Sequence, residues 1–480
     1  MRRELVDQMK CPYCLGHFSV THEHEQDAGH IKWALLRCRC FEFPIVDGVL
    51  LLSLVKGYGG SEETLAPYVP LQVAAIEYIR QGDISGLRRW IARHIPLIHR
   101  LISPDHVDYL GFSRDLNARL WPEVEKDLFA WNRYEVIGRR GALRRNPGSI
   151  NRLASTRIGS WLMRVRRRLF PQIWGTFYVN RFISTEFANL RTRLRDVRIA
   201  GPVLSLCCGH GPFELLLRGR SPTVPVVSLD GQLLNLFIVK RFVAPDASYI
   251  CHDVQFPLPF KDGVFSEVFS SSCLSELPSQ AQFIRESRRV AASNGWAMLD
   301  GVTPDVAGRI VPTRFYRVCQ NHFETLEDYR KLMLECADNR ALHFTPFEPA
   351  EARWTSDAVA LAGSDSATFL FHDGPLSNVQ SPRPDGFTAE ERAMLAVNPR
   401  YRATVEETRF AGRLRLGERM ATMLKMLKLG TLPAEIEIDR RKLDDPAYLK
   451  GLYESGLIVL LPRNFAEDAA YLFQEGAPRA

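Results

Sequence analysis

The stretch Val203-Leu-Ser-Leu-Cys-Cys-Gly-His-Gly-Pro-Phe213 decides the fold of this 480-residue chain. Its first four residues have the apolar pattern of a buried strand, two glycines follow at Gly209 and Gly211, and apolar residues to Leu217 indicate a helix. Glycine lets a ligand approach bare backbone at such a turn, and the first helical turn offers unpaired N–H groups. The stretch therefore predicts a strand, a tight turn and a helix N-terminus beside a ligand site. The alternative is a plain connection between a strand and a helix.

Further strands follow in alternation with helices. Val226 to Asp230 and Ser248 to Asp253 are apolar runs that each end in an acid, and Asp230 comes about 20 residues after the glycines, where a βαβ unit places an acceptor for ribose hydroxyls. This alternation predicts a mostly parallel α/β sheet of seven strands, with the ligand at the carboxyl ends of its strands. The other predicted elements are a strand through Val268 and Phe269, a helix from Ser279 that Asn294-Gly295 stops, and strands at Trp296 to Leu299, Leu342 to Thr345 and Ala367 to Phe371.

Two motifs in this region carry a family resemblance. The segment from Asp253 to Ser271 reads D-V-Q-F-P-L-P-F-K-D-G-V-F-S-E-V-F-S-S, and Arg285-Glu-Ser-Arg-Arg-Val290 is followed by Asn294-Gly295-Trp296. With the glycine turn, these motifs resemble the Rossmann-like core of the class I S-adenosylmethionine-dependent methyltransferases. The resemblance is closest to the type 11 branch, in which the patterns D-x-x-x-L-P-F-x-D-x-x-F-x-x-V-x-S-S and R-E-x-x-R-V-x-x-x-G-G occur. This chain has one extra residue before Leu258. It implies a methyltransferase that binds S-adenosylmethionine.

The resemblance also implies a set of cofactor-binding residues. Gly209 and Gly211 would lie under the methionine part of the cofactor, and Asp230 would accept hydrogen bonds from the ribose. Two positions depart from the family, which usually has an acid at Ser205 and a glycine at Cys207, so the hold on the cofactor's amino group is expected to be weaker. The remaining implied contacts are the adenine with Asp253 and Val254, and the reactive methyl group with Ser270.

Composition bounds the rest of the chain. Its length suggests about three domains, and 46% hydrophobic with 24% charged residues is ordinary for a globular protein. Met1 to Lys10 lacks the apolar segment of a signal peptide, and no apolar run reaches the roughly 18 residues of a membrane-spanning helix. We therefore expect a cytoplasmic protein.

Four cysteines near the N-terminus have metal-ligand spacing. They are Cys11 and Cys14 in a C-x2-C pair and Cys38 and Cys40 in a C-x-C pair. Two such knuckles can bring four thiolates around one structural Zn²⁺. The alternatives are four reduced cysteines in a small β-module, or one ligand replaced by a nearby histidine from the set His17, His22, His24 and His30.

The segment from Leu36 to Leu52, which contains Phe43-Pro-Ile-Val-Asp-Gly-Val49, adds a second resemblance. It is similar to the zinc-ribbon partner protein of tRNA and release-factor methyltransferases, whose second half reads C-x-x-C followed by P-I-x-D-G-I. A ribbon of this size buries little core by itself, so the metal would supply its folding energy.

Arginine is concentrated between residues 136 and 200. This segment has 15 arginines and no lysine, against Glu186 and Asp196. Arginine suits bidentate phosphate contacts, so the segment predicts either a nucleic-acid or phosphorylated-substrate surface, an acidic membrane surface, or simply a solvated helix face over the sheet. The surrounding residues 57–172 have helical periodicity, as at Leu71 to Ile79 and Leu87 to Ile102.

A small C-terminal unit follows the Ser/Pro/Gly-rich linker from Ser377 to Gly386. Thr388-Ala-Glu-Glu391 is a capping box, Leu414 to Leu429 is predicted as an amphipathic helix, and Gly456 to Leu461 as an apolar strand. This order predicts a winged-helix-like α+β module suited to partner contact or homodimerisation.

The expected domains are therefore a zinc ribbon (1–56), a helical Arg-rich region (57–172), a methyltransferase domain (173–375) and the C-terminal module (387–480). Ser270-Ser-Ser-Cys-Leu-Ser275 replaces the N/D-P-P-Y/F loop common in enzymes that methylate amide or exocyclic amino nitrogens. Three hypotheses for the function stay open: methylation of a small molecule such as a natural-product precursor, methylation of ribosomal or transfer RNA, and a methyltransferase-like scaffold without activity. No catalytic base is assigned.

Overall fold

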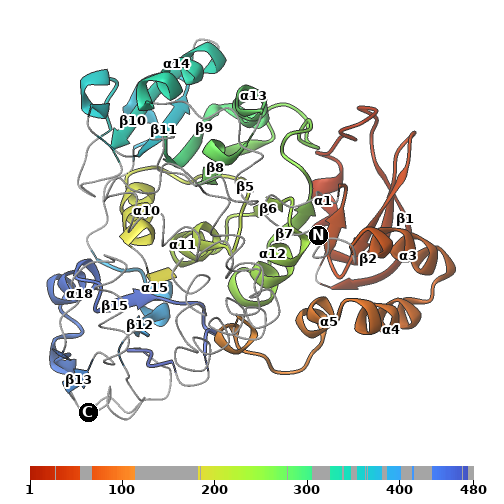
Figure 1. The fold of residues 1–480 in the computed structure, drawn as a ribbon, viewed down its shortest axis with the longest axis horizontal. Coiled ribbons are helices and arrows are strands. Elements are labelled where there is room, and N and C mark those ends of the chain that lie inside the picture. The colour runs from red at the N-terminus through yellow and green to blue at the C-terminus, as the bar shows by residue number, and fades with distance from the viewer. Residues whose placement is uncertain are drawn as a thin grey trace, which may run out of the picture.

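A single eleven-stranded sheet forms the centre of the protein, with the strand order β1-β2-β3-β4-β7-β6-β5-β8-β9-β11-β10 (Figure 1). Seven of these strands correspond to the predicted sheet, and four belong to the N-terminal segment. The computed structural model describes residues 1–27, 29–53, 68–113, 182–183, 185–277, 279–304, 325–337, 340–346, 354–362, 364, 366–380, 386–399, 401, 413–415, 435–466 and 469–473.

The seven-stranded part confirms the predicted α/β fold class. β7, β6, β5, β8 and β9 run parallel, and β11 is antiparallel to both β9 and β10. The carboxyl ends of the parallel strands meet at one edge, where such sheets bind their ligands. The bounds are β5 (Val203–Leu206), β6 (Val226–Asp230), β7 (Ser248–Cys251), β8 (Phe265–Ser271), β9 (Ala291–Val302), β10 (Ala341–Pro346) and β11 (Ala367–His372).

Helices cover both faces of this sheet, and alternate residues of each strand face them. Val203 of β5 belongs to one hydrophobic cluster, whereas Leu204 and Leu206 belong to the other, because successive side chains of a strand point to opposite faces. The first cluster includes α10 (Thr185–Arg195), α11 (Pro212–Arg220) and α12 (Leu233–Ile238), which continues as a π-helical turn (Val239–Val243), and the second includes α13 (Gln280–Val290) and α14 (Leu326–Ala337).

One helix end differs from the prediction. α13 ends at Val290 and β9 begins at the next residue, so Asn294-Gly295 lies inside the strand rather than stopping the helix. A Cβ on Gly295 would lie 2.2 Å from the carbonyl oxygen of Ser266, so the two backbones approach more closely than another residue would allow.

The N-terminal strands extend the methyltransferase-like sheet instead of forming a detached ribbon. β4 pairs in parallel with β7, and the register joins Val49 to Tyr249 and Leu51 to Cys251. Trp33 and Val49 are fully buried within the cluster that contains α11 and α12, so the ribbon does not depend on a core of its own. Its elements are α1 (Arg3–Val6), β1 (Ser19–Asp27), β2 (His30–Arg37), β3 (Glu42–Val46) and β4 (Val49–Leu51).

Three helices follow the ribbon, and two of them lie where one long helix was predicted over Leu87 to Ile102. The structure divides Leu87 to Ile102 at Ile95, which has an extended φ of −136° and precedes Pro96. Proline disfavours the helical conformation in the residue before it, which explains the break. The bounds are α3 (Tyr68–Gln81), α4 (Ile84–His94) and α5 (Pro96–Ile102).

The C-terminal unit packs against the sheet's helices. The predicted capping box is present at Thr388 and Glu391, and Met394 and Leu460 share a core with α11. Arg413–Arg415 forms strand β13, so the predicted amphipathic helix does not begin at Leu414, and most of that stretch lies outside the described residues. The elements are α15 (Ala389–Met394), β12 (Leu395–Val397), β13, β14 (Glu435–Glu437), α18 (Pro446–Glu454) and β15 (Ile458–Leu460), with short 3₁₀ turns at Leu274–Glu276, Ala358–Leu361, Leu376–Asn378 and Arg440–Lys442.

Candidate active site

The glycine turn leaves β5 and enters α11 at the carboxyl edge of the sheet. Cys207, Gly209 and Gly211 all have positive φ, at 54°, 54° and 77°. Within the part of the chain that the structure describes, a Cβ on Gly209 would meet only the carbonyl oxygen of Cys207, at 4.0 Å, which leaves space for a ligand beside it. A Cβ on Gly211 would instead lie 2.9 Å from Val239, so this glycine is required for packing against the following helix.

Asp230 ends β6 and points at the glycine turn. Its Oδ2 accepts a hydrogen bond from the Gly209 N–H at 2.8 Å, and its Oδ1 accepts one from the Gln232 N–H at 2.7 Å. Burial raises the pKa of this carboxyl to about 6, although both backbone bonds favour the charged form. Each oxygen keeps a second lone pair, so the carboxylate can accept further bonds from a ligand.

Asp253 lies two residues beyond the end of β7, the strand next to β6, and is followed by the buried Val254. Its Oδ1 accepts a hydrogen bond from the Gln255 N–H at 3.0 Å, and its own N–H donates to the Ser53 hydroxyl at 2.8 Å. Ser53 follows β4 in the chain. The N-terminal segment therefore contacts the end of β7 where the adenine is expected.

His252 also contacts Ser53, and both of its ring nitrogens are engaged in hydrogen bonds, so neither is available as a catalytic base. Its Nδ1 lies 3.2 Å from the Ser53 hydroxyl, and its Nε2 lies 3.0 Å from the carbonyl oxygen of Pro257. Because that carbonyl can only accept, Nε2 carries the proton and Nδ1 accepts from Ser53. Burial lowers the pKa of His252 to about 4, so the ring is neutral and holds the loop after Asp253.

Two more predicted site residues lie at the glycine turn. Cys207 is the first residue after β5, and Ser270 is on β8, the strand beside β5. Ser270 lies near the end of β8, and its register partner on β5 is Leu206. The Ser270 hydroxyl is buried and has no hydrogen-bond partner among the described residues. A hydroxyl without a partner at this edge suits a ligand that would supply one.

A charged cluster that the sequence did not indicate lies beside Ser271, the last residue of β8. Asp300, near the end of strand β9, accepts through Oδ1 from Arg193 Nη1 and from the Thr368 hydroxyl, both at 2.7 Å. Its Oδ2 accepts from the Ser271 hydroxyl at 3.0 Å. The acid directly after an apolar strand was a usable signal for Asp300, but nothing in the sequence pointed to Arg193 as its partner.

Two arginines in the described part of the Arg-rich segment face inward, whereas Arg198 is exposed. Arg191 and Arg193 are 5% and 4% exposed, and each forms an ion pair with a buried acid, Glu391 and Asp300 respectively. The stretch from 136 to 181 lies outside the described residues. These two arginines therefore hold the structure together and are not part of a phosphate-binding surface.

The four N-terminal cysteines converge. The sulfur atoms of Cys11, Cys14, Cys38 and Cys40 all lie within 4.8 Å of one another, and the Sγ atoms of Cys38 and Cys40 are 3.1 Å apart. Four thiolates around Zn²⁺, each about 2.3 Å from the metal, have sulfur–sulfur separations in this range. None of the four candidate histidines joins this group among the described residues.

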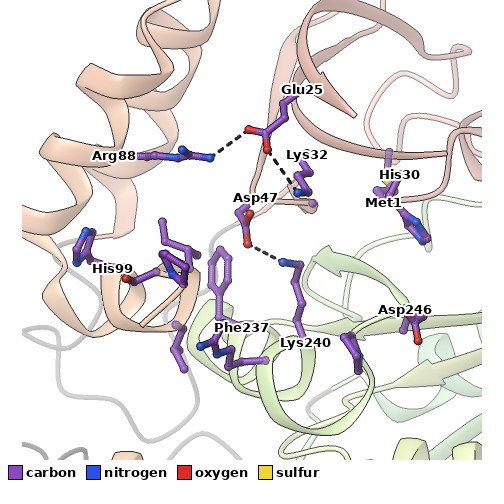
Figure 2. Close-up of a pocket in the computed structure, with 18 residues that line it drawn as sticks. Met1, Glu25, His30, Lys32, Asp47, Arg88, His99, Phe237, Lys240 and Asp246 are labelled. Carbon is purple, nitrogen blue, oxygen red and sulfur yellow. Dashed lines mark hydrogen bonds and ion pairs between the residues drawn. The ribbon is translucent and has the colours of Figure 1, made fainter. Parts of the chain in front are cut away.

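A cavity of about 660 Å³ lies away from the glycine turn, where the N-terminal strands, α4 and α5, and α12 meet (Figure 2). Lys240 Nζ lies 2.6 Å from Asp47, and Glu25 pairs with Arg88 at 3.1 Å and with Lys32 at 3.4 Å (Figure 2). No residue of the predicted cofactor site lines it. These ion pairs link the N-terminal strands to α4 and to the turn after α12.

The fold and the site define a class of protein: a doubly wound α/β protein with a ligand site at the carboxyl ends of its parallel strands. Residues 204–299 match the family model described as a methyltransferase domain. A comparison with curated protein sequences gives no match. Among the described residues, no helix is both long and apolar enough to cross a membrane.

Among the solved structures that match part of this chain are methyltransferases and a complex of a methyltransferase with its activator. A chain from the complex of the Haloferax volcanii Trm112 methyltransferase activator with a methyltransferase is 15% identical, with a TM-score of 0.31, over 40% of this chain and 90% of that one. A TehB-like enzyme from Corynebacterium glutamicum is 14% identical, with a TM-score of 0.30, over 45% and 98%. Phosphoethanolamine N-methyltransferase 2 from Haemonchus contortus is 14% identical, with a TM-score of 0.31, over 44% and 60%.

Proposed function

We propose that this protein is an S-adenosylmethionine-dependent methyltransferase that acts on a small molecule. The observation that carries the proposal is the contact between Asp230 and the Gly209 N–H, which aims a carboxylate at an open glycine turn within the methyltransferase domain. The unpartnered Ser270 hydroxyl on the adjoining strand adds a second polar group at the same edge.

The proposed cofactor contacts follow the strand ends. Gly209, with Gly211 fixing the turn, would lie under the methionine part, Asp230 would accept the ribose hydroxyls, and Asp253 with Val254 would face the adenine. Ser205 and Cys207 would border the amino group, and Ser270 the methyl group. When bound, S-adenosylmethionine supplies an electrophilic methyl group on its sulfonium sulfur. The chain's own contribution is to bind and orient the two reactants in line, which can supply much of the rate.

A small-molecule substrate is favoured over RNA by two observations. The motif from Asp253 to Ser271 resembles enzymes that act on small molecules, and two arginines of the segment 136–200, Arg191 and Arg193, are buried in ion pairs. RNA binding would make retention on RNA strongly dependent on salt, because phosphate contacts release counterions. Retention of the full chain on immobilised RNA that falls steeply with salt would favour the RNA alternative.

The decisive test is calorimetric titration of the full chain with S-adenosylmethionine and S-adenosylhomocysteine. We expect binding by the unaltered chain and at least tenfold weaker binding by Asp230→Asn, which keeps the shape but removes the charge that accepts the ribose bonds. Asp262→Asn is the matched control, because Asp262 is exposed and pairs with Arg289 away from the turn. Absence of heat at near-millimolar ligand would instead favour the inactive scaffold.

We also propose that the four cysteines hold structural Zn²⁺. Metal analysis of the purified chain should give one zinc per chain, and Cys38→Ser should lower this content. The zinc content depends on the number of cysteine ligands and does not require the protein to be catalytically active. A chain that carries no zinc after refolding with added metal would contradict it.

A further inference from the structure

Glu214 is a buried acid directly beneath the glycine turn. It lies in the first turn of α11, three residues after Gly211, and is 1% exposed. Its Oε1 accepts a hydrogen bond from the Ser228 hydroxyl at 2.8 Å, and its Oε2 has no hydrogen-bond partner among the described residues. A buried carboxyl with an open oxygen is unfavourable unless another group completes it.

The groups around Glu214 come from β5, β6, β7, the glycine turn and α11. Ser205 of β5 and Ser228 of β6 are register partners, and both hydroxyls favour the charged form of the Glu214 carboxyl. Asp230 on β6 acts in the opposite direction, as a neighbouring negative charge. The other titratable and charged groups close to this acid are Cys208 in the turn, Tyr249 on β7, and Arg218 on α11, which donates to the carbonyl oxygen of Val243.

Glu214 thus forms no ion pair with any residue that the structure describes. Burial raises its pKa to about 7, so near neutral pH a positive charge brought to the turn would shift it to the ionised form. The ligand proposed for this turn carries an ammonium group at its methionine end. Ser205, where the related family usually has an acid, lies against the same carboxyl.

We propose that Glu214 is the acid that recognises the ammonium group of the cofactor, replacing an acid at position 205. The inference rests on the proposed function and adds to it a residue outside the glycine motif. The carboxylate reaches the same location from the first turn of α11 that an acid at Ser205 would reach from β5.

Two ligands separate ammonium recognition from binding of the rest of the cofactor. S-adenosylhomocysteine has the ammonium group, and 5′-methylthioadenosine keeps the adenosine but lacks the amino-acid part. We expect Glu214→Gln to weaken S-adenosylhomocysteine binding at least tenfold and to change 5′-methylthioadenosine binding less than twofold. Glu267→Gln is the control, because Glu267 is also buried, with a pKa raised to about 7, but accepts from the N–H groups of Ala200 and Gly201 before β5.

Restoring the acid at the family position tests the replacement directly. In the Glu214→Gln background, Ser205→Asp should recover S-adenosylhomocysteine affinity. Equal affinity of Glu214→Gln and the unaltered chain for S-adenosylhomocysteine would overturn the inference while leaving the proposed function intact. If the unaltered chain bound neither ligand, the proposed function would fail first.

Proton release supplies a readout that needs no variant, should Glu214→Gln not fold. At about pH 6.5 the ligand's amino group is charged, since an α-amino pKa is about 8. Titration in two buffers of different ionisation enthalpy should then show protons released by S-adenosylhomocysteine in excess of those released by 5′-methylthioadenosine. Asp230 meets the ribose of both ligands, so its contribution is common to the two titrations. Equal proton release by the two ligands would contradict the role of Glu214.

Discussion

Individual buried acids determine how this protein responds to pH. Glu214 and Asp230 both lie at the glycine turn, and burial raises their pKa to about 7 and about 6. Glu214 has an open oxygen, whereas both oxygens of Asp230 accept backbone N–H groups. The two acids thus differ in the hydrogen bonds that offset the cost of burying a carboxylate. Glu214 has one oxygen without such a bond, whereas Asp230 has no such oxygen.

Replacing Glu214 should change the pH dependence of stability. The folded-state pKa of about 7 lies above the ordinary value of 4.5, so the folded chain binds this proton more tightly than the unfolded chain does. Stability from this group is therefore full below about pH 4.5 and is lost as the pH rises through about 7. The loss approaches about 3 kcal/mol, since one pKa unit corresponds to about 1.4 kcal/mol.

Urea unfolding at about pH 5 and about pH 8 measures this difference. Glu214→Gln should lose less stability than the unaltered chain over that interval. Asp230 and Glu267 titrate in both chains, so the difference reports Glu214 together with its interaction with Asp230. Parallel loss of stability in the two chains would show that the carboxyl does not hold its proton in the folded state.

At the scale of elements, helix α10 joins two parts of the chain that are distant in sequence. Arg191 donates two hydrogen bonds to Glu391 of α15, at 2.8 and 2.9 Å, and its guanidinium lies 4.1 Å from the Phe387 ring. Two residues further along, Arg193 pairs with Asp300 at the end of β9. α10 therefore links the C-terminal unit to the edge of the sheet that carries the site.

Breaking the Arg191–Glu391 pair should loosen this link. Arg191→Met leaves Glu391 buried without its partner, which typically costs about 3–5 kcal/mol, whereas the double variant with Glu391→Leu should recover much of the loss. The exposed pair Arg392–Asp444 is the control, because Asp444→Ala should cost at most about 1 kcal/mol. Urea unfolding measures all three, and equal effects of the two single variants would refute a buried clamp.

At the scale of the whole molecule, the ribbon and the methyltransferase sheet form one structure. β4 pairs with β7, and Ser53 after β4 hydrogen-bonds to Asp253 and His252 beside the site. Because strands and core are shared, loss of the cysteine cluster should affect the site as well as the ribbon.

Removal of metal should therefore weaken the whole sheet. We expect chelation, or Cys38→Ser, to lower the melting temperature of the chain by several degrees in a single transition and to weaken S-adenosylhomocysteine binding. Calorimetric melting with and without chelator measures the effect, with re-addition of zinc as the control. Two separate transitions, with the one that responds to S-adenosylhomocysteine unchanged, would show that the ribbon folds independently.

The sequence by itself determined the parallel strands, the glycine turn, the position of Asp230 beside that turn and the clustering of the four cysteines. Each of these follows from local periodicity or from a short spacing between residues. Val203 to Phe213 and the acid ending Val226 to Asp230 needed no distant partner to be predicted. Only the tertiary structure decided that the ribbon extends the sheet, that Arg191 and Arg193 turn inward, and that Glu214 lies under the turn. The reason is physical: the partners of those two arginines lie 200 and 107 residues away, so their pairing depends on how the chain packs and not on any local pattern.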